Sequence, residues 1–206
     1  MQSADVYAWI AGPEPRAGCD AFDVHVLASI LAIGVWQAET SRTSVVDAIG
    51  LDGDDLAELT AAFFPHTAAV FDRLRGREAS VCEGDEACLR DLLRRYTTEA
   101  TGFQNRLADM VARRCTRPNH LWQDLGLRNR NELSWMMARH FEPLASRNRS
   151  DMKWKKFLYR TICRDASFTL CAAPSCAECD DFGVCFGDES GESLLARTRR
   201  DAELRA

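Results

Sequence analysis

The sequence lacks several features that would place it in a common class of protein. Its longest apolar stretch, around Val24 to Val35, is interrupted by His25, Ser29 and Gly34. That stretch falls short of the roughly 20 apolar residues that a membrane-spanning helix needs, so we expect a soluble protein. We also find no internal repeat, which favours a single domain over a repeat array.

No positively charged, apolar leader of the secretory kind opens the sequence. We therefore expect a cytoplasmic protein whose cysteines stay reduced. The formal net charge is -5, so the excess of positive charge typical of general nucleic-acid binders is missing too. No nucleophile and base pair, phosphate-binding loop or catalytic pair of carboxylates stands out. We expect a carrier or binding protein and not an enzyme.

What is present favours helices. A length of 206 residues with 46% hydrophobic residues suffices for one domain with a substantial core. Apolar residues recur at helical spacing through most of the chain, which predicts a mainly α protein. We expect an irregular leader over residues 1–19, a single helical body over 20–166 and an irregular cysteine-rich loop over 167–190. Residues 191–206 should form a surface helix or a frayed tail.

Capping residues mark several of the expected helices. Asp20 is a suitable N-cap for a well-buried helix from Phe22 to Glu39, and Asn129 for a helix that runs through His140. Between Glu86 and Cys115 the pattern predicts one long helix or two helices joined near Gly102.

Two short helices are expected at 44–49 and 54–64, separated by a glycine C-cap at Gly50. This order is similar to a helix-turn-helix, which would indicate a DNA-binding regulator. The second helix, however, carries Asp54, Asp55 and Glu58 without any Lys or Arg. A phosphate backbone would repel such a helix, so we expect no DNA binding.

Three arginines, Arg113, Arg114 and Arg117, lie at the C-terminal end of the helical region that closes at Cys115. The helix dipole favours positive charge at that end, which is sufficient to explain them structurally. The alternative is that they bind an anion.

Four of the nine cysteines fall within one short window, with the spacing C-x4-C-x2-C-x5-C. They are Cys171, Cys176, Cys179 and Cys185. Clustering of this kind is typical of a metal site, and the first three cysteines repeat the spacing of plant-type ferredoxins, so we favour an iron-sulfur cluster. A structural zinc ion is the alternative, although zinc loops more often use two separated C-x2-C pairs. Disulfides are the weakest interpretation in a reducing compartment.

Other potential ligands give weaker signals. Cys82 and Cys88 form a lone C-x5-C pair, and Cys163 lies shortly before the cluster of four. His120 and His140 bracket the helix that begins after Asn129, and each could serve as a fifth ligand or a switch. Packing or a capping hydrogen bond is the commoner role for such histidines.

The region from Asp151 to Arg164 predicts a helix with an apolar face and a cationic face. The cationic face, here called the basic stripe, consists of Lys153, Lys156, Arg160 and Arg164. Six acidic residues and no Lys or Arg follow between 167 and 192. The stripe is either ordinary solvated surface or a surface that attracts an oxyanion or an acidic partner to the edge of the cluster.

These residues also carry a family likeness. The segments that show it are Trp122 to Leu127, Glu132 to Ser134, His140 and Phe141, Pro143 to Ala145, Asn148, Met152 to Arg160, and the cysteine run ending at Gly187. Together they resemble the NifQ family of nitrogen-fixation proteins. The likeness is strong from about Ala112 to Glu189 and thin before that.

The resemblance implies an iron-sulfur protein that takes up molybdenum in a molybdenum-iron-sulfur cluster. It further implies that this molybdenum, obtained from molybdate or a molybdenum-sulfur species, is donated for assembly of the iron-molybdenum cofactor of nitrogenase. The implied partners are the NifEN scaffold and the reductase NifH. The implied ligands are the four clustered cysteines, matched one by one.

Overall fold

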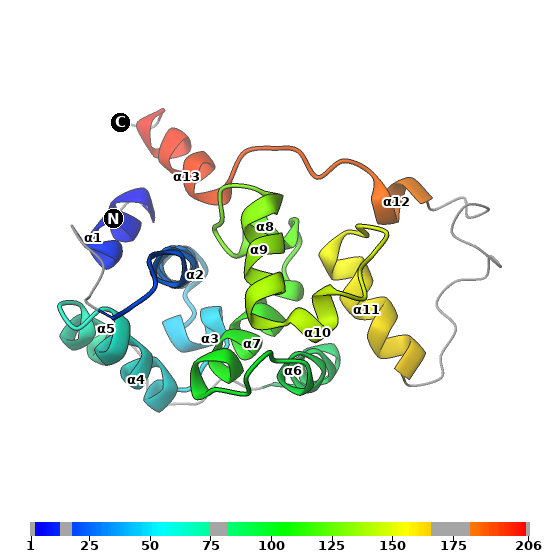
Figure 1. Ribbon diagram of the computed structural model, residues 1–206. Coiled ribbons are helices and arrows are strands. Elements are labelled where there is room, and N and C mark those ends of the chain that lie inside the picture. The colour runs from blue at the N-terminus through cyan, green and yellow to red at the C-terminus, as the bar shows by residue number, and fades with distance from the viewer. Residues whose placement is uncertain (1–2, 13–17, 75–81, 166–181, 205–206) are drawn as a thin grey trace.

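The computed structural model describes residues 3–12, 18–74, 82–165 and 182–204, and within these ranges it contains helices and no strands (Figure 1). The prediction of a mainly α protein is confirmed. In chain order the helices are α1 (Ser3–Ala11), α2 (Ala21–Ser41), α3 (Val45–Ile49), α4 (Gly53–Phe63), α5 (Ala68–Leu74), α6 (Asp85–Arg95), α7 (Gly102–Cys115), α8 (Leu121–Asp124), α9 (Arg130–His140), α10 (Glu142–Ala145), α11 (Trp154–Asp165), α12 (Phe182–Phe186) and α13 (Leu194–Glu203).

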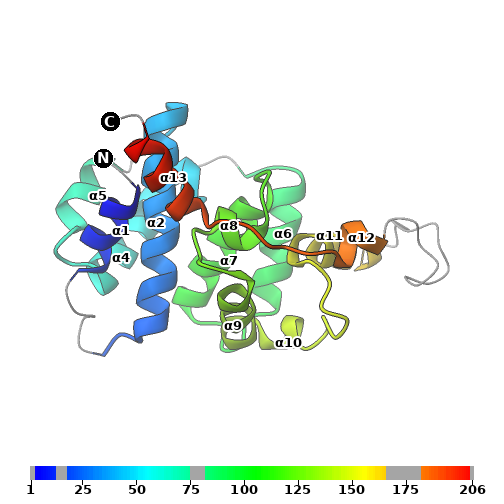
Figure 2. The ribbon, with the colours of Figure 1, turned by 90° about the horizontal axis from the view of Figure 1, so that it is seen from above.

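The longest helix, α2, lies in the middle of the molecule. It begins at the predicted cap, where the Asp20 side chain accepts hydrogen bonds from the amides of Phe22 and Asp23. Figure 2 shows α2 running between α1 on one side and α7 to α9 on the other. Every residue from Val26 to Val35 is buried, so this helix is apolar around its whole circumference.

By length and composition, α2 is the one helix in the described ranges that could cross a membrane. The sequence-based expectation that no stretch is apolar enough for a span is therefore wrong for this helix. Yet 61% of its most apolar window is buried against other helices. A helix in that position is what the core of a soluble protein contains, so the expectation of a soluble protein still agrees with the structure.

The expectation of an irregular leader over residues 1–19 is corrected by α1. Val6 and Ile10, four residues apart, are fully buried against α2, and Trp9 stacks on Phe71 of α5 at 6.2 Å between ring centroids. Glycine and proline at 12, 13, 15 and 18 suggested irregular structure, but they follow this helix instead of interrupting it.

The pair α3 and α4 forms as predicted, and Gly50 caps α3 in the left-handed conformation (φ 80°). A Cβ atom at Gly50 would lie 2.5 Å from the Cβ of Arg113, so only glycine fits there. Two acidic residues of α4 pair with α7, because Arg106 Nε lies 2.6 Å from Asp55 Oδ1 and its Nη2 contacts Glu58. Two of the three acids that argued against DNA binding, Asp55 and Glu58, therefore join α4 to α7.

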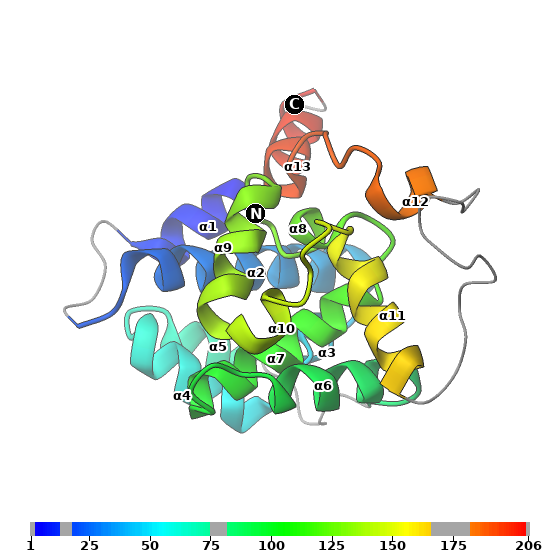
Figure 3. The same cartoon turned by 45° about the vertical axis from the view of Figure 1, so that its right-hand side comes forward.

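The region from Glu86 to Cys115 forms two helices, α6 and α7. The second begins at Gly102, where Thr101 Oγ1 accepts a hydrogen bond from the amide of Gln104. Helix α9 begins at the predicted cap Asn129 and ends at His140. Figure 3 shows α11 beside α6, which it contacts.

The C-terminal tail is helical between Leu194 and Glu203. This helix, α13, packs against α1 and α2, and its first residue Leu194 is 9% exposed. Figure 1 shows the N-terminal and C-terminal helices on the same side of the molecule. The surface-helix alternative for residues 191–206 is thus the one that the structure adopts.

Candidate metal centre

Of the four clustered cysteines, Cys171, Cys176 and Cys179 lie outside the described residues. Cys185 lies within α12, where it is half-buried and packs against the edge of the core. In the described ranges, no group of three or more His, Cys, Asp or Glu side chains is positioned to hold a metal ion. The geometry of the predicted ligand set therefore stays a prediction. The structure does show the contacts on either side of the cysteine-rich loop expected over 167–190, here called the cysteine segment.

On its C-terminal side, the segment is held through α12. The backbone amide of Lys153 donates to the carbonyl oxygen of Cys185 at 2.9 Å. The Nζ atom of Lys153 lies 3.4 Å from the carbonyl oxygen of Gly183. Lys153, a residue of the basic stripe, thus contacts the carbonyl oxygen of the fourth cysteine and that of a residue two positions before it.

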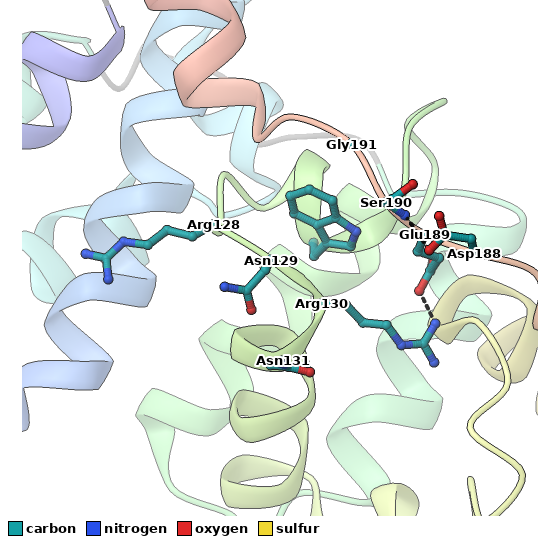
Figure 4. Close-up of a pocket in the computed structure, with 9 residues that line it drawn as sticks. Arg128, Asn129, Arg130, Asn131, Asp188, Glu189, Ser190 and Gly191 are labelled. Carbon is teal, nitrogen blue, oxygen red and sulfur yellow. Dashed lines mark hydrogen bonds and ion pairs between the residues drawn. The ribbon is translucent and has the colours of Figure 1, made fainter.

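A second attachment lies four residues further along, at Glu189. Its side chain is 5% exposed, and Oε1 lies 3.1 Å from His120 Nδ1. Oε2 pairs with Arg130 (Figure 4). Arg130 also donates to the Oδ1 of Asp151 at 2.7 Å. Here we call Glu189, His120 and Arg130 the exit anchor, because they fix the chain where it leaves the cysteine segment.

A third contact strengthens this attachment. Gln123 of α8 donates from Nε2 to the carbonyl oxygen of Glu192 at 2.9 Å. The exit anchor borders a surface pocket of about 330 Å³. Its lining comes from α8, the start of α9 and the chain after α12: Trp122, Arg128, Asn129, Arg130, Asn131, Asp188, Glu189, Ser190 and Gly191.

Asp188 differs from its neighbour Glu189 because it is exposed. The hydroxyl and the backbone amide of Ser190 hydrogen-bond its carboxylate and lower the pKa of Asp188 below its usual value. Asp188 therefore carries negative charge at the surface, as expected for an acid of this segment, whereas Glu189 uses its charge internally.

On the N-terminal side of the cysteine segment, α11 anchors the chain to the core. Trp154 and Leu158 are buried, and Trp154 Nε1 donates to Ser134 Oγ of α9 at 3.2 Å. The helix begins at Trp154 instead of at Asp151, since Asp151 has a positive φ of 52° and Lys153 is occupied by α12. The predicted apolar face is present and buried.

The basic stripe is therefore shorter than predicted. Lys156 and Arg160 are exposed on α11, whereas Lys153 precedes the helix and contacts α12. The side chain of Arg164 lies outside the described residues. Lys155, which was not assigned to the stripe, points to the other side and binds Asp124 Oδ2 at 2.5 Å.

The two histidines have structural partners. His140 Nε2 lies 2.9 Å from Asp23 Oδ1, and its ring meets Phe103 edge-on. His120 belongs to the exit anchor, which links it to the cysteine segment through Glu189. Cys82 and Cys163 are partly buried and Cys88 is exposed, and none of them joins a group of metal-binding side chains among the described residues.

Sequence reasoning missed the exit anchor. The sequence distinguished Glu189 in no way from the other five acidic residues between 167 and 192, and its partners lie 59 and 69 residues away in sequence. No spacing rule connects positions so distant. The available signal was the family-like segment beginning at Trp122, which contains Gln123 and starts two residues after His120.

Comparison with known proteins decides the family. The family model described as NifQ matches residues 26–187. The chain belongs to the NifQ family. This membership implies a role in nitrogen fixation and in the handling of molybdenum.

Individual NifQ relatives agree with this assignment. A "Protein NifQ homolog" of Sinorhizobium fredii is 35% identical over 183 residues, which cover 88% of this chain and 80% of the relative. A "Protein NifQ" of Rhodobacter capsulatus is 37% identical over 86% of this chain and 94% of the relative. One of Azotobacter vinelandii is 32% identical over 68% of this chain and 78% of its own length. No solved structure matches the chain.

The NifQ match extends further than the resemblance at first suggested. We found the likeness thin before Ala112, but the family model begins at residue 26, inside α2. The buried helix at the centre of the fold is therefore part of the family pattern.

Proposed function

We propose that this protein is an iron-sulfur molybdenum carrier that binds its cargo through Cys171, Cys176, Cys179 and Cys185. It donates the molybdenum for assembly of the iron-molybdenum cofactor of nitrogenase. The observation that carries the proposal is the four-cysteine run of a NifQ chain, flanked by a helix packed on the core and by the exit anchor. In this role it is a cytoplasmic carrier without catalytic turnover.

The donor set is suited to such a cargo. Thiolates are the usual ligands of iron-sulfur clusters, and Cys185, the one cysteine of the four within the described residues, is half-buried. Four thiolates can cover all four metal corners of a cuboidal cluster, which suits storage. Release requires a corner with a more labile ligand. We propose that three cysteines bind iron and that the fourth position, or a nearby oxygen or nitrogen donor, holds molybdenum.

The attachments on both sides of the segment support transfer. Carriers must present their cargo to a second protein without unfolding, and here α11 and the exit anchor join the segment to a single core. The proposed acceptor is the NifEN scaffold, with the reductase NifH as a further partner. Lys156 and Arg160, beside the start of the segment, are the proposed docking surface for an acidic partner or for molybdate.

A zinc-stapled interaction module is the alternative function, since four thiolates also bind zinc tetrahedrally. Anaerobic purification followed by measurement of iron, molybdenum and zinc in the same sample distinguishes the two. We expect a brown protein that contains iron and molybdenum. A colourless protein with one zinc ion per chain would favour the alternative.

The same metal measurements on single Cys→Ala variants test whether the four cysteines have separate roles in binding iron and molybdenum. We expect variants of the three iron-binding cysteines to lose both metals, and one variant to lose mainly molybdenum. Cys88→Ala is the matched control, because Cys88 is exposed and lies outside the run. Equal loss of both metals in all four variants would contradict separate roles.

A further inference from the structure

Arg114 in α7 is a buried arginine that forms no ion pair with a carboxylate of the described residues. Its side chain belongs to a residue that is 1% exposed, and Nη1 donates to Gln37 Oε1 of α2 at 2.5 Å. The Nε and Nη2 atoms are buried and have no hydrogen-bond partner. Burial, together with the neighbouring charge of Arg117, lowers the pKa of Arg114 to about 9, so the guanidinium is still charged at neutral pH.

Such an arrangement is costly unless something compensates for it. A buried charge normally has an opposite charge and a full set of hydrogen bonds, because desolvation costs several kcal/mol per ion. The neighbouring arginine shows the usual solution: Arg113 Nε lies 2.8 Å from Glu86 Oε2, and its Nη1 donates to the carbonyl of Asp47. Among the described residues, neither Arg114 nor Arg117 has a carboxylate partner.

Arg114 and Arg117 line the same pocket, of about 200 Å³, between α2, α7 and α8. Leu194 of α13 forms part of its wall. The full lining is Ile33, Trp36, Gln37, Thr40, Ser41, Arg114, Arg117, Pro118, Asn119, Asp124 and Leu194. This volume is below the roughly 300 to 1,000 Å³ of pockets for drug-sized ligands, so a small ligand fits best.

The single carboxylate in this lining does not neutralise the arginines. Asp124 Oδ2 lies 2.5 Å from Lys155 Nζ, and its Oδ1 accepts a hydrogen bond from Asn119 Nδ2 at 2.9 Å. Lys155 also donates to the carbonyl oxygen of Arg117 at 2.5 Å. Asp124 also attracts Arg114 electrostatically, but this one carboxylate faces the positive charges of Lys155, Arg114 and Arg117, so the pocket keeps an excess of positive charge.

The unused donors in the pocket belong to the arginines. Nε and Nη2 of Arg114 and Nε of Arg117 are buried and unpaired, whereas the Thr40 hydroxyl donates to the carbonyl of Trp36 within α2. Three donor atoms of this pocket are therefore without an acceptor among the described residues.

We propose that this pocket binds a small tetrahedral oxyanion, of the class that includes molybdate, phosphate and sulfate, between Arg114 and Arg117. A planar guanidinium with two free N–H groups matches two oxygens of such an anion, and a dianion balances both arginine charges. The site contains no cysteine and does not depend on the proposed function. If molybdate is the preferred anion, the pocket is an entry point for the cargo.

Calorimetric titration and thermal unfolding of the full-length protein test this site. Sodium molybdate, phosphate and sulfate are compared with sodium chloride at the same ionic strength. We expect at least one oxyanion to bind saturably and to raise the melting temperature beyond the chloride control. The order of affinities among the three anions identifies the natural class of ligand. No binding beyond chloride would overturn the proposal.

Substitutions of the two arginines test whether the oxyanion binds between them. We expect Arg117→Met to weaken oxyanion binding at least tenfold and Arg114→Met to abolish it. Without anion, Arg114→Met should be as stable as the wild type or more stable, because an unpaired buried charge is replaced by an apolar side chain of similar length. Arg95→Met is the matched control, because Arg95 is exposed and does not line the pocket.

Two further outcomes keep this site distinct from the cysteine segment. If Arg114→Met fails to fold, the oxyanion affinity of Arg117→Met decides the test. Arg117 is only partly buried, so this variant is expected to fold. Wild-type affinity in Arg117→Met would overturn the proposal. A Cys171→Ala/Cys185→Ala double variant should bind the oxyanion normally, even though it is expected to lose iron.

Discussion

Glu189 and Asp188 are adjacent acids that the protein uses in opposite ways. Asp188 is exposed, whereas the Glu189 carboxylate is 5% exposed and contacts both His120 and Arg130. Removing one partner of a buried ion pair leaves the other charge uncompensated, which costs more than the pair itself contributes. A single acid therefore attaches the end of the cysteine segment to the helical body.

We expect Glu189→Gln to lower the free energy of unfolding by about 2 kcal/mol, because Arg130 and His120 lose their common acceptor. Urea unfolding at neutral pH measures the change. Asp188→Asn serves as the control and should stay within about 0.5 kcal/mol of the wild type. Similar losses in both variants would show that Glu189 is not a special attachment point.

The residue scale also shows what sequence can and cannot predict about arginines. Arg113, Arg114 and Arg117 occupy one helix end, and the dipole argument applies to all three alike. The structure separates them, since Arg113 forms an ion pair with Glu86, while Arg114 is fully buried and forms none with the described residues. Burial and distant partners decide this difference, and neither is encoded in local spacing.

At the scale of helices, local signals predicted several beginnings correctly. Asp20, Thr101 and Asn129 each accept the capping hydrogen bond at a helix start, and Asp20 and Asn129 were named from sequence. The error at α11 has a tertiary cause. Residues 151–153 continue the helical pattern, but Asp151 takes a left-handed conformation and Arg130 binds it, so the helix starts three residues later.

The cysteine segment could be predicted only in part. Its spacing and family likeness identify the four cysteines, and NifQ membership is confirmed by the family match. Its attachment to the body depends on contacts with α8 and α9, which lie more than 50 residues earlier. Such contacts follow from the packing of the whole chain and cannot be derived from the segment itself.

The charge of α11 makes a prediction about transfer. We expect Lys156→Glu/Arg160→Glu to reduce molybdenum loading or transfer to the acceptor severalfold, while iron content stays at the wild-type level. Reversed charge repels an acidic partner or an oxyanion without touching the cysteines, and the effect should shrink as salt increases. Metal analysis and a transfer assay at low and physiological salt measure it.

The matched control reverses two other exposed arginines, Arg95→Glu and Arg149→Glu. This control changes the net charge by the same amount. If it reduces transfer equally, the effect comes from overall charge and the basic stripe is ordinary solvated surface.

At the scale of the whole molecule, one hydrophobic core extends from Val6 in α1 to Leu158 in α11. Helix α13 closes this core by packing on α1 and α2, so the described chain begins and ends on the same side. The cysteine segment leaves the core at α11, and the chain returns to it through the exit anchor and α13. The helices on both sides of the cysteine segment, α11 and α13, therefore pack on the same helical body.

Closure by α13 can be tested at Leu194, which is 9% exposed. We expect Leu194→Ala to lower the free energy of unfolding by about 2 kcal/mol, since a buried side chain is truncated and a cavity remains. Leu204→Ala is the control, because Leu204 is 78% exposed and should change stability little. Urea unfolding again provides the measurement, and equal effects would mean that α13 contributes no specific packing.

The buried position of α2 has a consequence for synthesis in the cell. This helix contains a stretch long and apolar enough to cross a membrane, and in the folded chain most of that stretch is covered by other helices. Its covering helices arrive in sequence, and α13 is translated only after the cysteine segment. A nascent chain whose α2 is not yet covered exposes this apolar surface, so we expect the soluble yield to rise when general chaperones are co-expressed.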